Sequence, residues 1–68
     1  MRANEAREII KKIWDEIFCD DDPFIGRVET FENGSIRAVV EDTICTIIDN
    51  GENYTVLSEG CYLCTVNK

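Results

Sequence analysis

The sequence predicts an α+β domain in which one N-terminal amphipathic helix packs on a four- or five-stranded antiparallel β-meander. Apolar residues recur at helical spacing in the first third of the chain, and short β-rich runs separated by Gly-containing turns follow. The 68 residues, 44% of them apolar, suffice for one small domain over residues 1–68 and exclude two domains or a large enzyme fold. We therefore expect a single core between the helix and the sheet.

The helix is expected at about residues 4–19. Asn4 is the predicted N-cap. The helix should end near Cys19, because the aspartates at 20–22 would lie at the negative end of the helix dipole and Pro23 disfavours helical geometry before it. Its predicted apolar face has three- and four-residue spacing and consists of Ala6, Ile9, Ile10, Ile13, Trp14, Ile17 and Phe18.

Three turn signals divide the remainder into strands. Asn33-Gly34 favours a type I′ turn, which needs positive φ at both central positions. Asn50-Gly51 marks a second hairpin, and Glu59-Gly60 marks a third turn. The expected strands lie at about 24–32, 35–41, 43–49, 52–58 and 61–66. A two-residue turn at Asn33-Gly34 pairs Phe31 with Ile36, which gives a core face of Ile25, Phe31, Ile36, Ala38 and Val40.

The connection between the second and third strands is open to two interpretations. Alternation is unbroken from Ile36 to Ile48, without a Gly, Pro or Asn. Either Glu41-Asp42-Thr43 forms a tight turn, or residues 35–49 form one long bent strand. The first interpretation gives five strands and the second gives four, and both are antiparallel meanders.

A single helix covers only one face of such a sheet. Continuous alternation places Val28, Val39, Cys45 and Ile47 on the second face, with Tyr54 or Leu57 according to register. Either the sheet curls into a half-barrel that buries these residues, or a homodimer or docked protein covers them. The last strand is also a candidate for pairing across a dimer edge. The predicted apolar interface is Val28, Val39, Ile47 and Tyr54.

The formal charge of −7 counts against a nucleic-acid binder, which needs a basic surface. No Lys or Arg lies between Ala38 and Asn67, although that stretch contains five acids. Such a surface either keeps the protein soluble or steers a basic partner toward it. The predicted partner-binding residues are Glu41, Asp42, Asp49, Glu52 and Glu59, with Asp20, Asp21 and Asp22 in a separate loop.

The residue types argue against catalysis and against a cofactor. The chain has no His, so no Ser-His or Cys-His pair exists, and its glycines are isolated rather than grouped in a phosphate-binding loop. Cys61 and Cys64 have a zinc-site spacing, but residues three apart on a strand face opposite sides. With Cys19 and Cys45 they are expected to be free thiols, and no metal ligand is assigned; a metal-thiolate protein using all four is an alternative.

Charged residues interrupt every apolar run near the N-terminus, so no signal peptide is predicted. No stretch approaches the ~18 apolar residues of a membrane span. We therefore expect a cytoplasmic protein with reduced thiols and no membrane or direct nucleic-acid contact.

These observations predict a non-enzymatic acidic protein-binding module. The most specific version of this prediction is an inhibitor that occupies the basic surface of a nucleic-acid-processing complex. In size and charge the chain is similar to phage-encoded inhibitors of host defence, including anti-CRISPR proteins that mimic DNA. The alternative from a different class is a homodimeric structural or regulatory protein that associates through an apolar sheet face.

Overall fold

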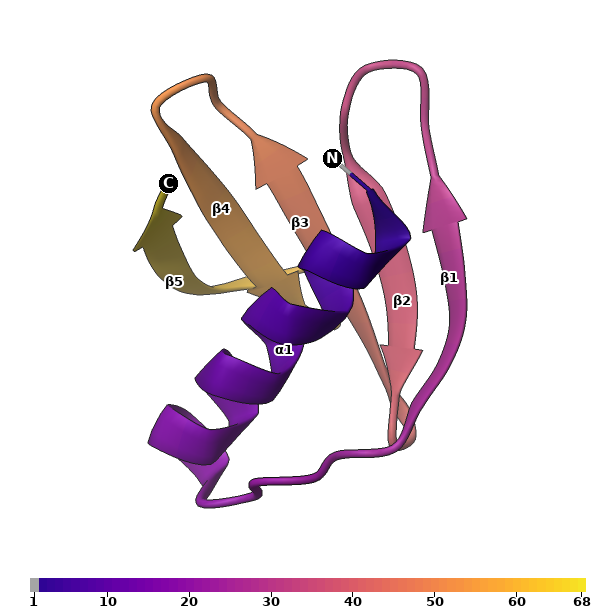
Figure 1. The fold of residues 1–68 in the computed structure, drawn as a ribbon, viewed down its shortest axis with the longest axis vertical. Helices are drawn as coiled ribbons and strands as arrows, with labels where there is room; N and C mark the ends of the chain where they lie inside the picture. Colours follow the sequence, from indigo (N-terminus) through magenta and orange to yellow (C-terminus); the bar gives the residue numbers. More distant parts are fainter. Residues whose placement is uncertain (1) are drawn as a thin grey trace.

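Five antiparallel strands, in the order β1-β2-β3-β4-β5, curl around one helix in the computed structural model, which describes residues 2–68 (Figure 1). This arrangement confirms the predicted α+β class, with five strands rather than four. Within the described residues, no helix is both long and apolar enough to cross a membrane. The elements are α1 (Ala3–Phe18), β1 (Ile25–Thr30), β2 (Ile36–Val40), β3 (Thr43–Asp49), β4 (Asn53–Ser58) and β5 (Cys61–Asn67).

The helix ends as expected but begins differently. Arg2 is the N-cap, with extended backbone and no side-chain hydrogen bond, so the predicted cap Asn4 lies inside the first turn. At the other end Cys19 adopts the left-handed conformation, with φ of 55°. The backbone N–H groups of Cys19 and Asp20 both donate to the carbonyl oxygen of Trp14, the latter at 3.1 Å. These bonds satisfy a terminal carbonyl and turn the chain toward the sheet.

The predicted two-residue turn at Asn33-Gly34 is wrong. The backbone N–H of Phe31 donates to the carbonyl oxygen of Ser35 at 3.0 Å, and that of Gly34 donates to the carbonyl oxygen of Phe31 at 3.0 Å. Gly34 has a positive φ of 88°, whereas Asn33 does not adopt one. The Asn33 side chain instead accepts a hydrogen bond from the Ser35 N–H at 3.0 Å, which stabilises a longer loop.

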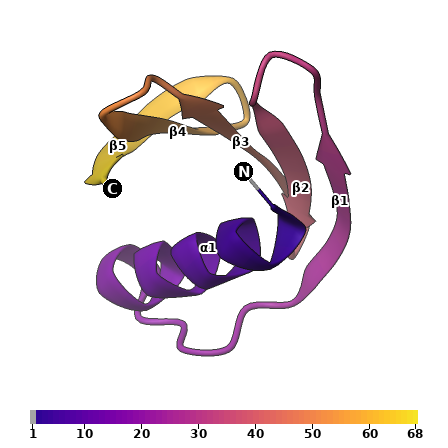
Figure 2. The ribbon, with the colours of Figure 1, turned by 45° about the horizontal axis from the view of Figure 1, so that its top comes forward.

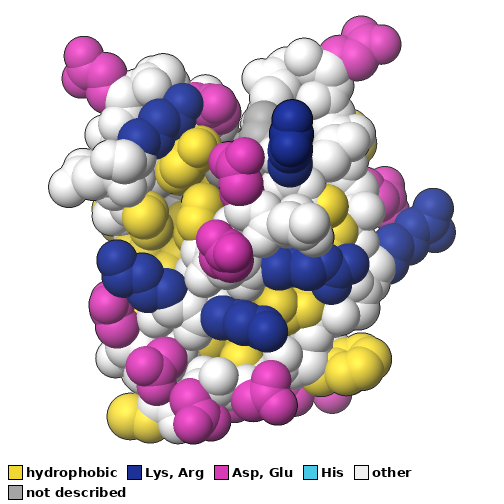
Figure 3. Space-filling view, viewed as in Figure 1, with side chains coloured by type: hydrophobic (Ala, Val, Ile, Leu, Met, Phe, Trp, Pro, Cys, Tyr) yellow, Lys and Arg dark blue, Asp and Glu magenta, His cyan; other side chains and the backbone are white. Residues whose placement is uncertain are grey.

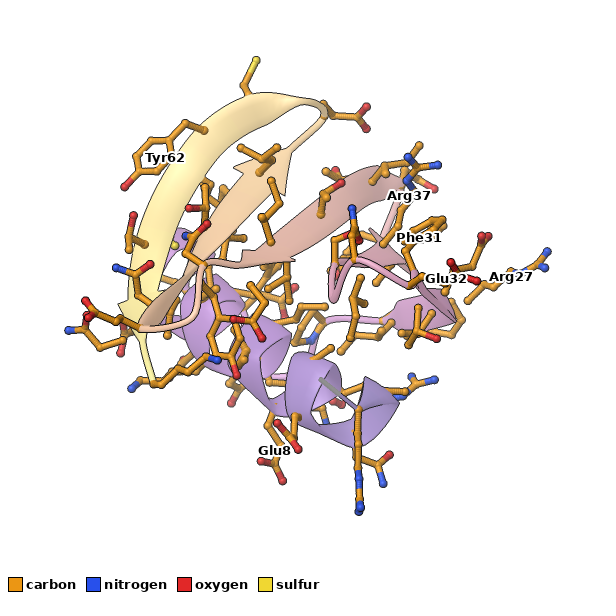
Figure 4. All side chains as sticks on the ribbon, turned by 90° about the horizontal axis from the view of Figure 1, so that it is seen from above. Glu8, Arg27, Phe31, Glu32, Arg37 and Tyr62 are labelled. Atoms are coloured by element: carbon orange, nitrogen blue, oxygen red, sulfur yellow. The ribbon has the colours of Figure 1, made fainter. Side chains whose placement is uncertain are left out.

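The longer loop shifts the register of β1 by one residue. Thr30, rather than Phe31, is paired with Ile36, so Val28 turns toward the core. Phe31 leaves the predicted core face and is 41% exposed. The Arg37 guanidinium lies 5.4 Å from the centre of the Phe31 ring, and the two side chains meet beside the β1–β2 loop (Figure 4).

The predicted composition of the second sheet face is wrong, because Glu41-Asp42 forms a tight turn. Val40 is paired with Thr43 across this turn, and paired residues share a face of the sheet. The inward positions are therefore even-numbered in β2 and odd-numbered in β3. Cys45 and Ile47 consequently face α1, as do Val28 and Tyr54, whereas Val39 alone of the predicted apolar interface points outward.

The core lies between α1 and the concave side of the sheet (Figure 2). Each of its side chains is at most 5% exposed, and no buried side-chain nitrogen or oxygen within residues 2–68 lacks a hydrogen-bond partner. The core residues are Ala6, Ile10, Ile13 and Trp14 from α1, and Ile36, Ala38, Val40, Cys45, Ile47 and Val56 from the sheet.

The convex side of the sheet has no helix over it. Val39 is paired with Ile44 there, and both are about two-fifths exposed. Ile48 is 37% exposed, and Tyr62 projects from β5 away from α1 (Figure 4). We call this surface, made of Val39, Ile44, Ile48 and Tyr62, the outer sheet face.

Adjacent isoleucines on β3 provide a test of which face is buried. Ile47→Ala is expected to destabilise the protein by about 3 kcal/mol, because it removes a fully buried side chain and leaves a cavity. Ile48→Ala removes the same atoms from the outer sheet face and should cost less than about 1 kcal/mol. Urea unfolding followed by circular dichroism measures both, with Ile47→Val as a milder variant. Equal losses would contradict the observed facing of β3.

Candidate functional site

The eight predicted partner-binding acids fall into two groups at opposite ends of the sheet. Because consecutive turns of a meander alternate between its two ends, the β2–β3 and β4–β5 turns lie together, next to the α1–β1 connection. Figure 3 shows acidic side chains at the foot of the molecule, where that connection runs. We call this group the acidic end; it consists of Asp20, Asp21, Asp22, Glu41, Asp42 and Glu59.

One backbone hydrogen bond joins two of the three connections of the acidic end, and another fixes the third connection to β3. The N–H of Glu41 donates to the carbonyl oxygen of Phe24 at 2.7 Å, which joins the β2–β3 turn to the α1–β1 connection. The N–H of Glu59 donates to the carbonyl oxygen of Ile44 at 2.9 Å, and its Oε1 accepts the Ile44 N–H at 3.2 Å. The carboxylates are therefore carried by a braced backbone.

Like charges meet at the acidic end, and no salt bridge within residues 2–68 neutralises them. The pKa of Glu41 is raised chiefly by a hydrogen bond with the side chain of Asp20, and the negative charges of Asp20 and Asp42 add to this effect. Within residues 2–68 the ion pairs are Arg27–Glu29 at 3.5 Å and Lys68–Asp49 at 2.8 Å, and neither reaches this group. The carboxylates thus remain available to external cations.

Exposed apolar side chains border the acidic end. Phe24, which follows Pro23 in the α1–β1 connection, is 72% exposed, and Phe18 at the end of α1 is half exposed. On the convex side, the outward pair Val39–Ile44 lies one pair away from the Glu41-Asp42 turn. Aromatic and aliphatic groups beside charge are typical of protein interfaces.

The two remaining predicted acids lie at the other end, in or next to the β3–β4 turn. Lys68 donates a hydrogen bond to Asp49, which lowers the pKa of Asp49 and raises that of Lys68. Asp49 Oδ1 also accepts the backbone N–H of Gly51 at 2.8 Å. Asp49 therefore orders the turn, while Glu52 is exposed beside it. The structure does not bring these two acids together with the acidic end.

The four cysteines are free thiols in different surroundings. Cys19 and Cys61 are exposed, Cys64 is partly buried, and Cys45 is buried. Burial raises the pKa of Cys45 to about 11, with a smaller contribution from Cys64. Within the described part of the chain, no three His, Cys, Asp or Glu side chains form a group that could hold a metal ion.

Two pockets flank α1. One, of about 290 Å³, lies against the α1–β1 connection and is lined by Arg7, Lys11, Asp22, Pro23, Phe24 and Ile25. The other, of about 270 Å³, separates the last turns of α1 from β5. We call the second the β5 cleft; it is lined by Lys12, Ile13, Glu16, Ile17, Cys64, Thr65, Val66 and Asn67.

Thiol reactivity should follow this order of burial. At pH 8 a thiol with a pKa of about 11 is thiolate in only about a thousandth of molecules, so Cys45 should react last. We expect Cys19 and Cys61 to be alkylated at least about tenfold faster, as measured by mass spectrometry of timed samples. Added Zn²⁺ should leave this order unchanged. Modification of Cys45 as quickly as Cys61 without denaturant would contradict the burial described here.

Glu41 should make stability depend on pH in a definite direction. A carboxyl whose pKa is higher in the folded than in the unfolded protein favours folding when protonated, so this stabilisation falls as pH rises through that range. Glu41→Gln should therefore raise the urea midpoint at pH 7 and lose this advantage in acid. Glu52→Gln, which removes one charge at the other end, is the control. A larger gain in the control would show that Asp20 does not strain Glu41.

No protein-family model, curated protein or solved structure matches the chain.

Proposed function

We propose that the chain is a non-enzymatic protein-binding module whose acidic end occupies a basic, nucleic-acid-binding surface of another protein. One observation carries this proposal: six acidic side chains lie in three connections at one end of the sheet, and none of them forms an ion pair within the described residues. A braced array of carboxylates offers the charge that lysines and arginines of such a surface otherwise bind as phosphate.

Clustering of the acids distinguishes this proposal from a role in solubility alone. Solubility requires net charge, which spreading the acids over the surface would supply equally well. The raised pKa of Glu41 indicates instead that its carboxylate is disfavoured beside Asp20. Local arrangements that oppose stability are characteristic of surfaces retained for binding. The position of the acids therefore supports a recognition role.

The apolar residues beside the acidic end favour a protein partner over a small cation. Phe24 and the Val39–Ile44 pair offer a partner apolar area that a hydrated ion could not use. Arginine side chains could pair with the carboxylates and also stack on Phe24. The proposed partner surface is therefore basic with an apolar neighbour, and the module competes there with nucleic acid.

Charge reversal at matched positions tests this function. The variant Asp20→Lys/Asp22→Lys/Glu41→Lys changes the acidic end. The control Glu8→Lys/Glu32→Lys/Glu52→Lys changes net charge equally at exposed positions on α1 and at the other end of the sheet (Figure 4). Each immobilised protein is incubated with cell lysate at about 50 and about 500 mM salt, and bound proteins are eluted with duplex DNA.

The wild type and the control should retain the same DNA-eluted proteins at low salt. The acidic-end variant should bind them at least about tenfold less, because close interfacial charge pairs are lost. Circular dichroism verifies that all three chains are folded. Equal retention by the two triple variants, or retained proteins that DNA does not displace, would refute the proposal.

A further inference from the structure

The two edges of the sheet are protected unequally. Both edge strands have one irregularity in their pairing, between Ile25 and Val28 in β1 and at Leu63 in β5, but only β1 carries charged residues, Arg27 and Glu29. Charges on an edge strand hinder its pairing with another chain. β5 contains no Pro and no charged residue, and after its irregularity at Leu63 it pairs regularly with β4 through Asn67. The backbone groups on its free edge are therefore open to another strand.

The helix does not cover this edge. Figure 2 shows α1 and β5 apart from each other on the open side of the curled sheet. The β5 cleft is lined by residues of both elements. Ile17, predicted from its spacing to be in the core, is 45% exposed at this cleft. Cys64 and Val66 line the other wall and are only partly buried. An added strand would cover apolar side chains that α1 leaves uncovered.

We propose that β5 pairs antiparallel with β5 of a second copy of this chain, across a two-fold axis at Thr65. Residues paired across this axis share a face of the joined sheet. Cys64 of each copy would lie opposite Val66 of the other on the side of the cleft, near Ile17. The axis would place the two Thr65 side chains together on the convex side. Two five-stranded sheets would become one continuous sheet.

The charge distribution selects this edge as the place where a second copy can dock. Each copy has a net charge of −7, so two copies repel each other except where both are neutral. Residues 60–67 are the longest run in the sequence without Asp, Glu, Lys or Arg. The edge is thus the surface where self-association meets least repulsion.

Salt separates this inference from the proposed function. Screening weakens the repulsion between two −7 chains, so added salt should strengthen the dimer. The same screening should weaken binding of the acidic end to a basic partner. The dimer uses β5 rather than the acidic end. Either proposal can therefore fail without the other.

Sedimentation equilibrium over a range of protein concentrations tests the dimer. The wild type should approach twice 7.8 kDa as concentration or salt increases. Thr65→Lys places two like charges at the axis and should weaken association at least about fivefold. Thr30→Lys, the same change on an exposed threonine of β1, is the matched control and should leave association unchanged.

A second variant and a direct measurement distinguish a weakened dimer from a misfolded chain. Ile17→Lys alters the cleft without touching β5 and should also weaken the dimer. Amide hydrogen exchange in wild-type β5 should slow with concentration at the groups facing away from β4. A 7.8 kDa species under all conditions would refute the proposal. So would a dimer that folded Thr65→Lys leaves intact but Ile48→Lys disrupts, because the outer sheet face would then be the interface.

Discussion

Packing of α1 against the concave side of the sheet is the contact on which the rest of this structure depends. Four helical and six strand side chains form the only core that the described residues contain, and its members are fully or almost fully buried. A chain of 68 residues has little further apolar surface to bury. The sheet therefore curls around one helix, and its convex side, its free edges and its connections remain open. These surfaces are exposed because residues 2–68 form only one helix to cover one sheet.

The sequence predicted the helix and the strands well, but it predicted poorly which strand side chains face the core. Helical spacing and turn signals depend on local chemistry, so α1 and a meander of four or five strands could be anticipated, with bounds within a few residues of those observed. Facing depends on the number of residues in each turn, since one residue more or less moves every later side chain to the opposite face. The loop at Phe31–Ser35 is longer than predicted, which brought Val28 inward. The tight turn at Glu41-Asp42 brought Ile47 inward and left Ile44 outside.

The acidic end could be predicted only in part, for a related reason. The sequence shows which acids belong to connections, but strand number decides at which end of a meander each connection lies. Because the sequence allows either four or five strands, it does not show that Glu41 and Glu59 lie at one end of the sheet and Asp49 and Glu52 at the other. The link between Glu41 and Phe24 is a long-range backbone contact that no local pattern reveals. Exposure of Phe24 was likewise not anticipated, although its position after Pro23 in an acidic loop was a signal that could have suggested it.

The two proposed interactions are geometrically compatible, and the direction of β5 explains why. β5 begins beside the acidic end, after Glu59-Gly60, and runs to Lys68 near Asp49 at the other end. In an antiparallel β5 pair, the two acidic ends would therefore lie at opposite extremities of the joined sheet. Their mutual repulsion would be screened over that separation, because the Debye length at physiological salt is about 8 Å. A dimer built in this way would present two separate acidic ends, so a target with two basic sites could be bound twice, with the gain in avidity that linked sites provide.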